Sequence, residues 1–255
     1  MTAPLRIKLI CCDVFLRMVS ALVADSPHII DVEFVPMLAH NEPDLLRADL
    51  QRRINAAAAQ QEYDMFLLSY GLCGNAVLGL TCPVPLVMPR VHDCCALFMG
   101  GQLPFLKHFG ARLSMRWCSA GYFERGYGRG TGGAFSPRLR TASPEYQALV
   151  EKHGAENADY VWGTLHPEIE MDTAAYIRTA GFDIPAYEAA FTRLITDQGK
   201  KVEILEGDPA YLRDLINGPW DSARFLTLAH GQEIAAVYDM EEVVTARTIG
   251  LAPPT

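Results

Sequence analysis

The sequence lacks an apolar run long enough to cross a membrane. A spanning helix needs about 20 consecutive apolar residues, whereas the short apolar stretch near the beginning, LRIKLICCDVF, is interrupted by Asp13 and then by Arg17. Its pattern is that of a first strand rather than of a secretion signal. We therefore expect no membrane partner and place the protein in the cytoplasm.

Basic residues are also few. The chain of 255 residues has 22 Lys and Arg against 30 Asp and Glu, which gives a formal net charge of −8. Nucleic acids and anionic lipid surfaces are bound by basic protein surfaces, so we expect neither as a partner. Apolar residues make up 50% of the chain, a globular composition. The expected partner is a small-molecule substrate.

The seven cysteines lack the arrangement of a disulfide framework. Their number is odd, Cys11-Cys12 and Cys94-Cys95 are adjacent pairs, and the chain contains no C-x-x-C motif. In an intracellular protein such thiols are more often metal ligands, reactive groups or core residues. Four of the seven, with one histidine, lie in residues 70–95, YGLCGNAVLGLTCPVPLVMPRVHDCC. This stretch is where a functional site is expected.

Strands and helices alternate along the first part of the chain. The apolar and alternating segments predict strands at 5–12, 31–37, 63–69 and 85–88, with helices at 14–24 and 41–60. Strands that alternate with helices form parallel sheets through right-handed crossovers. We therefore predict an α/β fold with an open, mostly parallel Rossmann-like sheet and helices on both of its faces.

Two α/β halves are expected. Residues 1–110 form the first, and residues 111–255 form a second unit packed on it. The expected elements of the second unit are strands at 112–117, 201–205 and 224–228 and helices at 144–165 and 185–199. Residues 121–133 are rich in glycine, which disfavours regular structure, so we expect a mobile loop or lid that borders the site.

The cysteine and histidine residues that could form a site follow the predicted strands. Cys12 closes the first strand, His40 follows the second, Cys73 follows the third and Cys94 follows the fourth. The carboxyl ends of parallel strands meet at one edge of a sheet, and ligands bind there. Strand direction, rather than any spacing motif, therefore predicts that these side chains converge.

Thiolates and imidazoles are ligands for zinc and for iron–sulfur clusters. The predicted metal ligands are Cys12, Cys73, Cys94 and His92; the predicted catalytic residues are Tyr70, Arg90 and Asp93; and the predicted cofactor-binding residues are Gly71, Gly74 and His40. Alternative roles stay open for several of them. His92 can be a turn residue, Arg90 can form a structural ion pair and Tyr70 can simply pack. The remaining cysteines of the region are expected in the core, namely Cys11, Cys82 and Cys95.

The two central turns resemble those of the DUF1638 family of bacterial and archaeal proteins. The family pattern is a cysteine that ends the first strand, a Tyr-Gly-x-Cys-Gly turn and a Pro-Arg-x-His-Asp-Cys turn before a helix. The turns stand here at 70–74 and 89–94, and further similarity lies at 153–161 and 206–221. The family often occurs beside corrinoid-dependent methyl-transfer genes, so the resemblance implies a role in methyl or one-carbon metabolism.

Two functions are consistent with these observations. The first is a metal-dependent enzyme, with zinc as the expected cofactor, that acts on a methylated or thiol-containing small molecule. The alternative is a non-catalytic carrier of a metal, an iron–sulfur cluster or a corrinoid that serves a methyltransferase partner. The chain lacks the D-x-H-x-x-G segment of the common corrinoid-binding domain.

Overall fold

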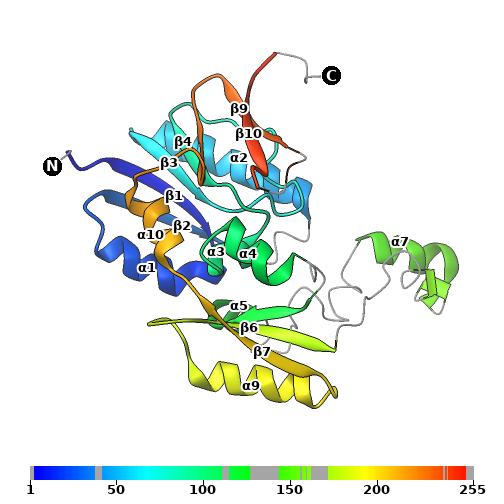
Figure 1. Cartoon of the computed structure of the whole chain (residues 1–255). Helices are drawn as coiled ribbons and strands as arrows, with labels where there is room; N and C mark the ends of the chain where they lie inside the picture. Colours follow the sequence, from blue (N-terminus) through cyan, green and yellow to red (C-terminus); the bar gives the residue numbers. More distant parts are fainter. Residues whose placement is uncertain are drawn as a thin grey trace. The chain divides into compact units, whose positions relative to one another are not determined.

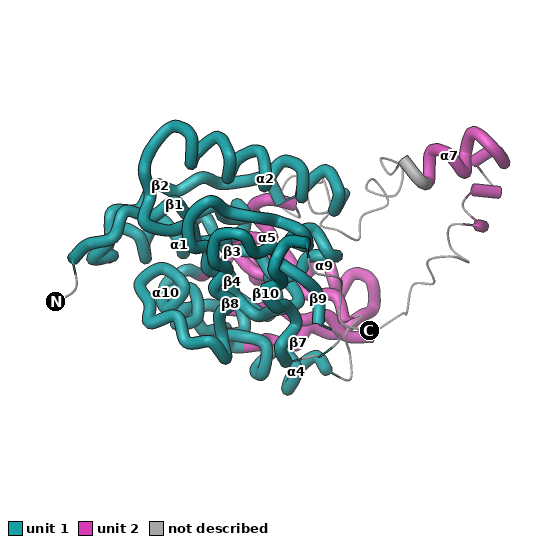
Figure 2. The backbone as a smooth tube through the Cα atoms, turned by 90° about the horizontal axis from the view of Figure 1, so that it is seen from above, with its two compact units in different colours: residues 1–111, 179–182, 206–255 teal, residues 112–178, 183–205 magenta. Residues whose placement is uncertain are grey.

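The chain folds into two compact units, which Figure 2 shows in different colours. Unit 1 comprises residues 1–111, 179–182 and 206–255, and unit 2 comprises residues 112–178 and 183–205. The computed structural model describes residues 3–37, 42–110, 115–126, 144–155, 157–158, 160–161, 172–237, 239 and 241–250.

A five-stranded sheet forms the centre of unit 1 (Figure 1). Its order is β2-β1-β3-β4-β8, and the strands are β1 (Arg6–Cys12), β2 (Ile29–Val35), β3 (Met65–Ser69), β4 (Leu86–Pro89) and β8 (Phe225–Leu228). The first four are parallel, and β8 is antiparallel to β4. The sequence of β3, MFLLS, is buried throughout, as is usual for a strand that is covered on both faces. The predicted open, mostly parallel α/β sheet is confirmed.

Helices cover both faces of this sheet. The 3₁₀ turn η1 (Asp13–Phe15) and helix α1 (Leu16–Ala24) lead from β1 outward to β2, whereas α2 (Pro43–Gln60) leads from β2 back across β1 to β3. Right-handed crossovers in opposite directions place α1 and α2 on opposite faces. Helix α10 (Ala210–Asn217) packs beside α1 (Figure 1).

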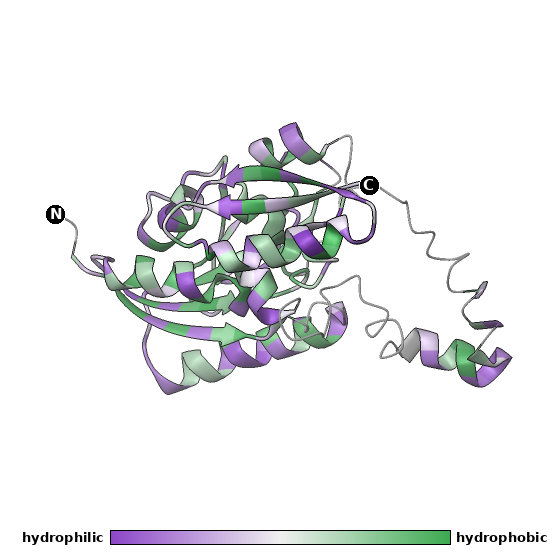
Figure 3. Cartoon of the chain, turned by 90° about the horizontal axis from the view of Figure 1, so that it is seen from below, coloured by the Kyte–Doolittle hydropathy of each residue, from purple (hydrophilic) through white to green (hydrophobic). Residues whose placement is uncertain are grey.

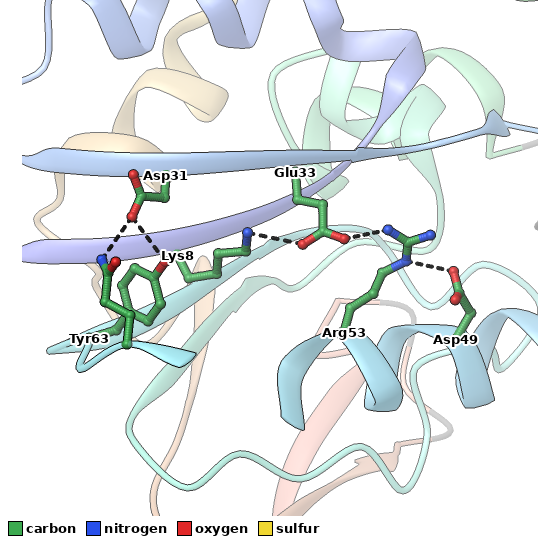
Figure 4. Close-up of polar contacts among 7 residues, drawn as sticks. Lys8, Asp31, Glu33, Asp49, Arg53 and Tyr63 are labelled. Atoms are coloured by element: carbon green, nitrogen blue, oxygen red, sulfur yellow. Dashed lines mark hydrogen bonds and ion pairs between the residues drawn. The ribbon is translucent and has the colours of Figure 1, made fainter. Parts of the chain in front are cut away.

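Charged side chains tie α2 to β1 and β2 (Figure 4). Lys8 Nζ lies 2.9 Å from Glu33 Oε2, Arg53 also pairs with Glu33, and Arg53 Nε lies 2.6 Å from Asp49 Oδ2. Burial alone would raise the pKa of Glu33, but its hydrogen bonds from Lys8 and Arg53 outweigh burial and lower it. The network therefore joins three elements through one carboxylate.

The remaining part of unit 1 completes the surroundings of β3 and β4. Helices α3 (Cys94–Phe98) and α4 (Gln102–Phe109) follow β4 and pack together. Strands β9 (Gln232–Ala236) and β10 (Val244–Thr248) form an antiparallel hairpin. Strand β9 also contacts the segment after β3, because Gly79 N donates to Ile234 O at 2.8 Å and Ile234 N donates to Leu80 O at 3.1 Å.

Unit 2 has a smaller sheet with the strand order β5-β6-β7. Its elements are β5 (Trp117–Ser119), α5 (Ala120–Arg125), α7 (Pro144–His153), β6 (Thr173–Thr179), α9 (Pro185–Thr196) and β7 (Lys201–Gly207). Strands β5 and β6 are parallel. Helices of the chain carry hydrophilic and hydrophobic residues in alternating bands (Figure 3), the pattern of helices with one face against a sheet. None of the described helices is long and apolar enough to span a membrane.

The structure differs from the expectations for residues 111–255. Residues 206–255 belong with unit 1 rather than with the second unit, because β8 pairs with the edge of β4. The first part of the expected 121–133 loop is helical, since α5 continues to Arg125 with Gly121 inside it; its Ser119 hydroxyl caps the helix by accepting from Tyr122 N. The rest of that loop, residues 127–133, lies outside the described residues.

Candidate functional site

The turns after β3 and β4 run side by side at the carboxyl edge of the sheet. Leu72 N donates to Val91 O at 3.0 Å, and Cys73 N donates to His92 O at 2.9 Å. These bonds extend the parallel pairing of β3 and β4 beyond the ends of the strands. They bring the Tyr-Gly-x-Cys-Gly turn against the Arg-x-His-Asp-Cys turn.

Gly71 allows this close approach. A Cβ atom on Gly71 would lie 2.7 Å from Asp93 N and 2.8 Å from both Asp93 Cα and His92 C. All three atoms belong to the backbone, which cannot move aside as a flexible side chain does. The contribution of Gly71 that the structure makes visible is therefore the packing of the two turns, rather than contact with a cofactor.

Cys73 lies in a left-handed turn. Cys73, Gly74 and Asn75 have φ angles of 45°, 65° and 74°, and Ala76 N donates to Cys73 O at 3.3 Å. A non-glycine residue in this region costs about 1–2 kcal/mol, and such conformations concentrate at functional sites. Gly74 is suited to the turn by its φ angle, because a Cβ there would meet only Pro43 Cγ, at 3.5 Å.

Cys73 is an electrostatic neighbour of the two other predicted sulfur ligands. The pKa of Cys73 is raised well above its ordinary value by burial, and then by Cys94 and Asp93. The pKa of Cys12 is likewise raised by burial, and its neighbours Cys11, Cys73 and Asp13 raise it further against a hydrogen bond with the Val14 backbone. The charge of Cys73 therefore bears on the pKa of Cys12, and the charge of Cys94 bears on the pKa of Cys73.

Tyr70 lies beside the same thiols. Its side chain is only 4% exposed, and its hydroxyl has no hydrogen-bond partner within the described part of the chain. Burial raises the pKa of Tyr70, and Cys12, Cys11, Cys73 and Asp13 raise it further. The hydroxyl is therefore a protonated donor at the edge of the thiol cluster.

Asp93 and His92 are held by the start of α3 and by α4. Asp93 is the N-cap of α3, where Asp93 Oδ1 accepts from Ala96 N at 3.3 Å. Burial raises the pKa of Asp93, against hydrogen bonds from the Ala96 and Cys95 backbones and the charge of His92. His92 N donates to Gln102 Oε1 at 3.1 Å, while its buried Nε2 has no partner among the residues that the structure describes.

The side chain of Arg90 binds residues that come much later in the sequence. Its Nε donates to Ser222 O at 2.9 Å, and its Nη1 pairs with Glu242 Oε1 at 3.3 Å and with Val244 O. Its backbone N also donates to Arg224 O at 2.9 Å. The guanidinium therefore holds Ser222, Glu242 and Val244 at the exit of β4, a structural role of the kind considered for it.

The other cysteines of the region are core residues. Cys11 and Cys95 are completely buried and Cys82 is 4% exposed. Burial raises the pKa of Cys11 to about 12 and that of Cys82 to about 11. His40, predicted to bind a cofactor, lies outside the described residues.

Asp13 is a member of the site that the sequence reasoning missed. Its carboxylate accepts a hydrogen bond from Met37 N at 2.8 Å, which joins the exits of β1 and β2, and it acts on Cys12 and Tyr70. A signal was present, since Asp13 directly follows the first strand as Cys73 and Cys94 follow theirs.

Within the described ranges, no three His, Cys, Asp or Glu side chains are arranged to hold a metal ion. A tyrosine hydroxyl, two carboxylates and three thiols thus line the edge where β1, β3 and β4 end.

These features define an α/β protein with a thiol-lined site at the carboxyl edge of a parallel sheet. The chain belongs to the DUF1638 family, described as proteins of unknown function, whose sequence profile matches residues 34–216. No curated protein and no solved structure shows significant similarity to the chain.

Proposed function

We propose that the protein is a metal-dependent enzyme, with zinc at the thiol cluster, that acts on a methylated or thiol-containing small molecule in one-carbon metabolism. The position of Cys73 carries the proposal, because this thiol interacts with Cys12 and Cys94 although the three follow different strands. Sulfur and imidazole nitrogen are the ligands that zinc prefers.

The electrostatics of the cluster favour a cation. Burial, and then the neighbouring thiols and acids, raise the pKa of Cys12 and Cys73, so each thiolate is unfavourable without a positive charge nearby. A dication would offset this repulsion and displace the thiol protons. When bound, zinc would lower the pKa of a substrate thiol and present it as a nucleophile.

Metal binding requires some side-chain movement. Because no described group of three ligands already surrounds a point, the thiols must turn toward a common centre or accept a ligand such as His40. A cysteine reorients by rotation about χ1 alone, between three staggered positions. The buried Nε2 of His92, which has no described partner, supplies a nitrogen ligand from the adjacent turn.

The alternative is a non-catalytic carrier of a metal, an iron–sulfur cluster or a corrinoid for a methyltransferase partner. The buried hydroxyl of Tyr70 beside the thiols favours a site where a ligand is handled rather than only stored.

All seven cysteines are free thiols, which supports our proposal of a reducing compartment such as the cytoplasm.

Metal analysis of the anaerobically purified protein, together with its absorption spectrum, tests the proposal. Zinc is colourless, whereas an iron–sulfur cluster or a corrinoid absorbs visible light, so the spectrum separates a zinc protein from a carrier of a cluster or a corrinoid. Cys73→Ser should sharply reduce the zinc content, because a hydroxyl does not replace a thiolate on a soft metal.

Cys82→Ser is the matched control, since Cys82 is a buried free thiol of the same segment. It should cost roughly 1–3 kcal/mol of stability by burying a hydroxyl and should leave the zinc content per folded molecule unchanged. Full zinc content in Cys73→Ser would remove Cys73 from the site.

A further inference from the structure

Two of the seven cysteines differ from the others in exposure. Cys73 and Cys94 are half-buried. The other five are buried, namely Cys11, Cys12, Cys82, Cys95 and Cys118. Reaction of a thiol with a solute requires that the solute reach it. Cys73 and Cys94 are therefore the two cysteines best placed to react with a small molecule in the folded chain.

The same two cysteines lie in turns whose backbones are in direct contact. Cys73 N donates to His92 O at 2.9 Å. A Cβ atom on Gly71 would stand 2.7 Å from Asp93 N, so the turn that carries Cys73 also meets the residue directly before Cys94. Cys94 itself begins α3, whose N-cap is Asp93.

This spacing suits a covalent bond between the two side chains. Hydrogen-bonded backbones lie about 4.8 Å apart, and a disulfide joins residues whose Cα atoms lie about 4.4–6.8 Å apart. Cys94 comes one residue after the backbone contact at Asp93. Burial raises the pKa of Cys73, and the charge of Cys94 raises it further, which agrees with two neighbouring sulfurs. A bond between them requires adjustment of the two turns alone.

We propose that Cys73 and Cys94 are a redox pair, which a low-molecular-weight disulfide such as oxidised glutathione converts into an internal disulfide bond. The inference goes beyond the proposed function and does not depend on a metal, because it uses only the two thiols. Disulfides that form in a reducing compartment are usually transient and either catalytic or redox-sensing.

The reaction is a thiol–disulfide exchange in two steps. Cys94 attacks first, because its partner Cys73 has a raised pKa and keeps its proton. The Cys94 thiolate displaces one glutathione thiolate, which takes up the proton that Cys94 lost. Cys73 then loses its proton and attacks the Cys94 sulfur, and the second glutathione leaves with that proton. Two protein thiols are oxidised to one disulfide, and one glutathione disulfide is reduced to two thiols.

The experiment uses the full chain, freed of metal with EDTA and incubated in glutathione buffers with an increasing oxidised fraction. Acid stops the exchange, N-ethylmaleimide blocks the remaining thiols, and peptide mass mapping locates the disulfide. We expect one internal disulfide, between the peptides of Cys73 and Cys94, that is lost again after dithiothreitol is added. The five buried cysteines should be recovered as thiols.

Cys95→Ala is the matched control, because Cys95 adjoins Cys94 in the sequence but is completely buried. It should form the disulfide as the wild type does. Cys94→Ala should lose the disulfide completely. Cys73→Ala should also lose it and should instead keep glutathione bound to Cys94, since the second step has no attacking thiol. Circular dichroism confirms that each variant is folded.

The mapping of the wild type decides the inference even if a variant fails to fold. A wild-type protein that stays reduced in the most oxidised buffer overturns it, as does one that carries glutathione adducts without an internal disulfide. A disulfide that joins either cysteine to another one also overturns it. Because the protein is metal-free throughout, its failure leaves the proposed zinc function standing, and absence of zinc from the purified protein leaves the inference standing.

Discussion

Gly71 allows the two site turns to pack closely because it has no side chain. A methyl group there would stand 2.7–2.8 Å from backbone atoms of Asp93 and His92, so Gly71→Ala must push the two turns apart. We expect a loss of roughly 1–3 kcal/mol in the free energy of unfolding, as for other overpacked positions. The Cys73 thiol should also react faster with a thiol reagent, because its turn no longer lies against Asp93.

Gly74→Asn is the comparison for this change. Asparagine tolerates the left-handed conformation better than most residues, and the space beside Gly74 is open enough for a Cβ, with Pro43 Cγ at 3.5 Å. Urea unfolding should therefore show a smaller loss than for Gly71→Ala. Equal losses in the two variants would mean that close packing at Gly71 is unimportant.

The buried thiol of Cys11 makes stability depend on alkaline pH. Burial raises its pKa from 9.0 to about 12 in the folded protein, so the thiol binds its proton more tightly in the folded chain than in the unfolded chain. Its contribution to stability is complete below pH 9 and is lost as pH rises toward 12. The expected slope is up to about 1.4 kcal/mol per pH unit for one such group.

Urea unfolding of the metal-free protein between pH 8 and pH 11 measures this slope. Cys11→Ala is less stable at pH 8, because it leaves a cavity, but its stability should fall less steeply with pH than that of the wild type. Parallel curves for the two proteins would show that Cys11 does not contribute to the alkaline dependence.

At the scale of elements, Glu33 joins strands β1 and β2 to helix α2. Hydrogen bonds from Lys8 and Arg53 outweigh its burial and lower its pKa below 4.5. The carboxylate therefore stabilises the fold above that value, and its contribution is lost as pH falls through the lowered pKa. Glu33→Gln should destabilise the protein at pH 7 and should differ less from the wild type at an acidic pH below the lowered pKa.

Thermal melts at the two pH values check this expectation. The change at pH 7 should be of order 1 kcal/mol, since Lys8 and Arg53 are partly exposed and water screens their charges. Glu188→Gln is the control for a general effect of removing a paired acid, because Glu188 of α9 pairs with Arg178 of β6. A Glu33→Gln variant with the same loss at both pH values would contradict the electrostatic account.

The elements that were predictable are those with local signals. The parallel strands at the centre of unit 1 lie within two residues of their expected positions, because their apolar runs and the intervening helices are visible in the sequence. The strand β6 and the hairpin β9–β10 were missed. Their sequences, TAAYIRT, QEIAA and VTART, contain small and polar residues that weaken the alternation expected of strands.

The features of the site also fall into those that the sequence could predict and those that it could not. Strand direction placed Cys12 at the end of β1 and Cys73 and Cys94 after β3 and β4, where the structure has them; their approach to one another stays a prediction. Strand direction did not predict the contact of Gly71 with Asp93 or the capture of Arg90 by residues 222–244, because both depend on backbone packing between segments distant in sequence.

At the scale of the whole molecule, Arg90 and β9 hold the site turns from the far end of the chain. Arg90 contacts Ser222, Glu242 and Val244, and Ile234 pairs with the segment after the Cys73 turn. Arg90→Met should therefore increase amide hydrogen exchange in two places that lie far apart in sequence, residues 72–80 and the β9–β10 hairpin.

Arg178→Met serves as the control, because its partner is Glu188 of α9. It should increase exchange in β6 and α9 and leave residues 72–80 unchanged. Wild-type exchange in residues 72–80 of the Arg90→Met variant would show that Arg90 does not hold the site turns.

The pairing of β8 with β4 has a consequence for the newborn chain. A ribosome makes the thiol-bearing turns, up to Cys94, more than a hundred residues before it makes β8 and β10. During that interval the edge of β4 is open, and Ser222, Glu242 and Val244, which will hold Arg90, do not yet exist. The edge of β4 and the contacts of Arg90 are therefore completed only after Val244 has been synthesised.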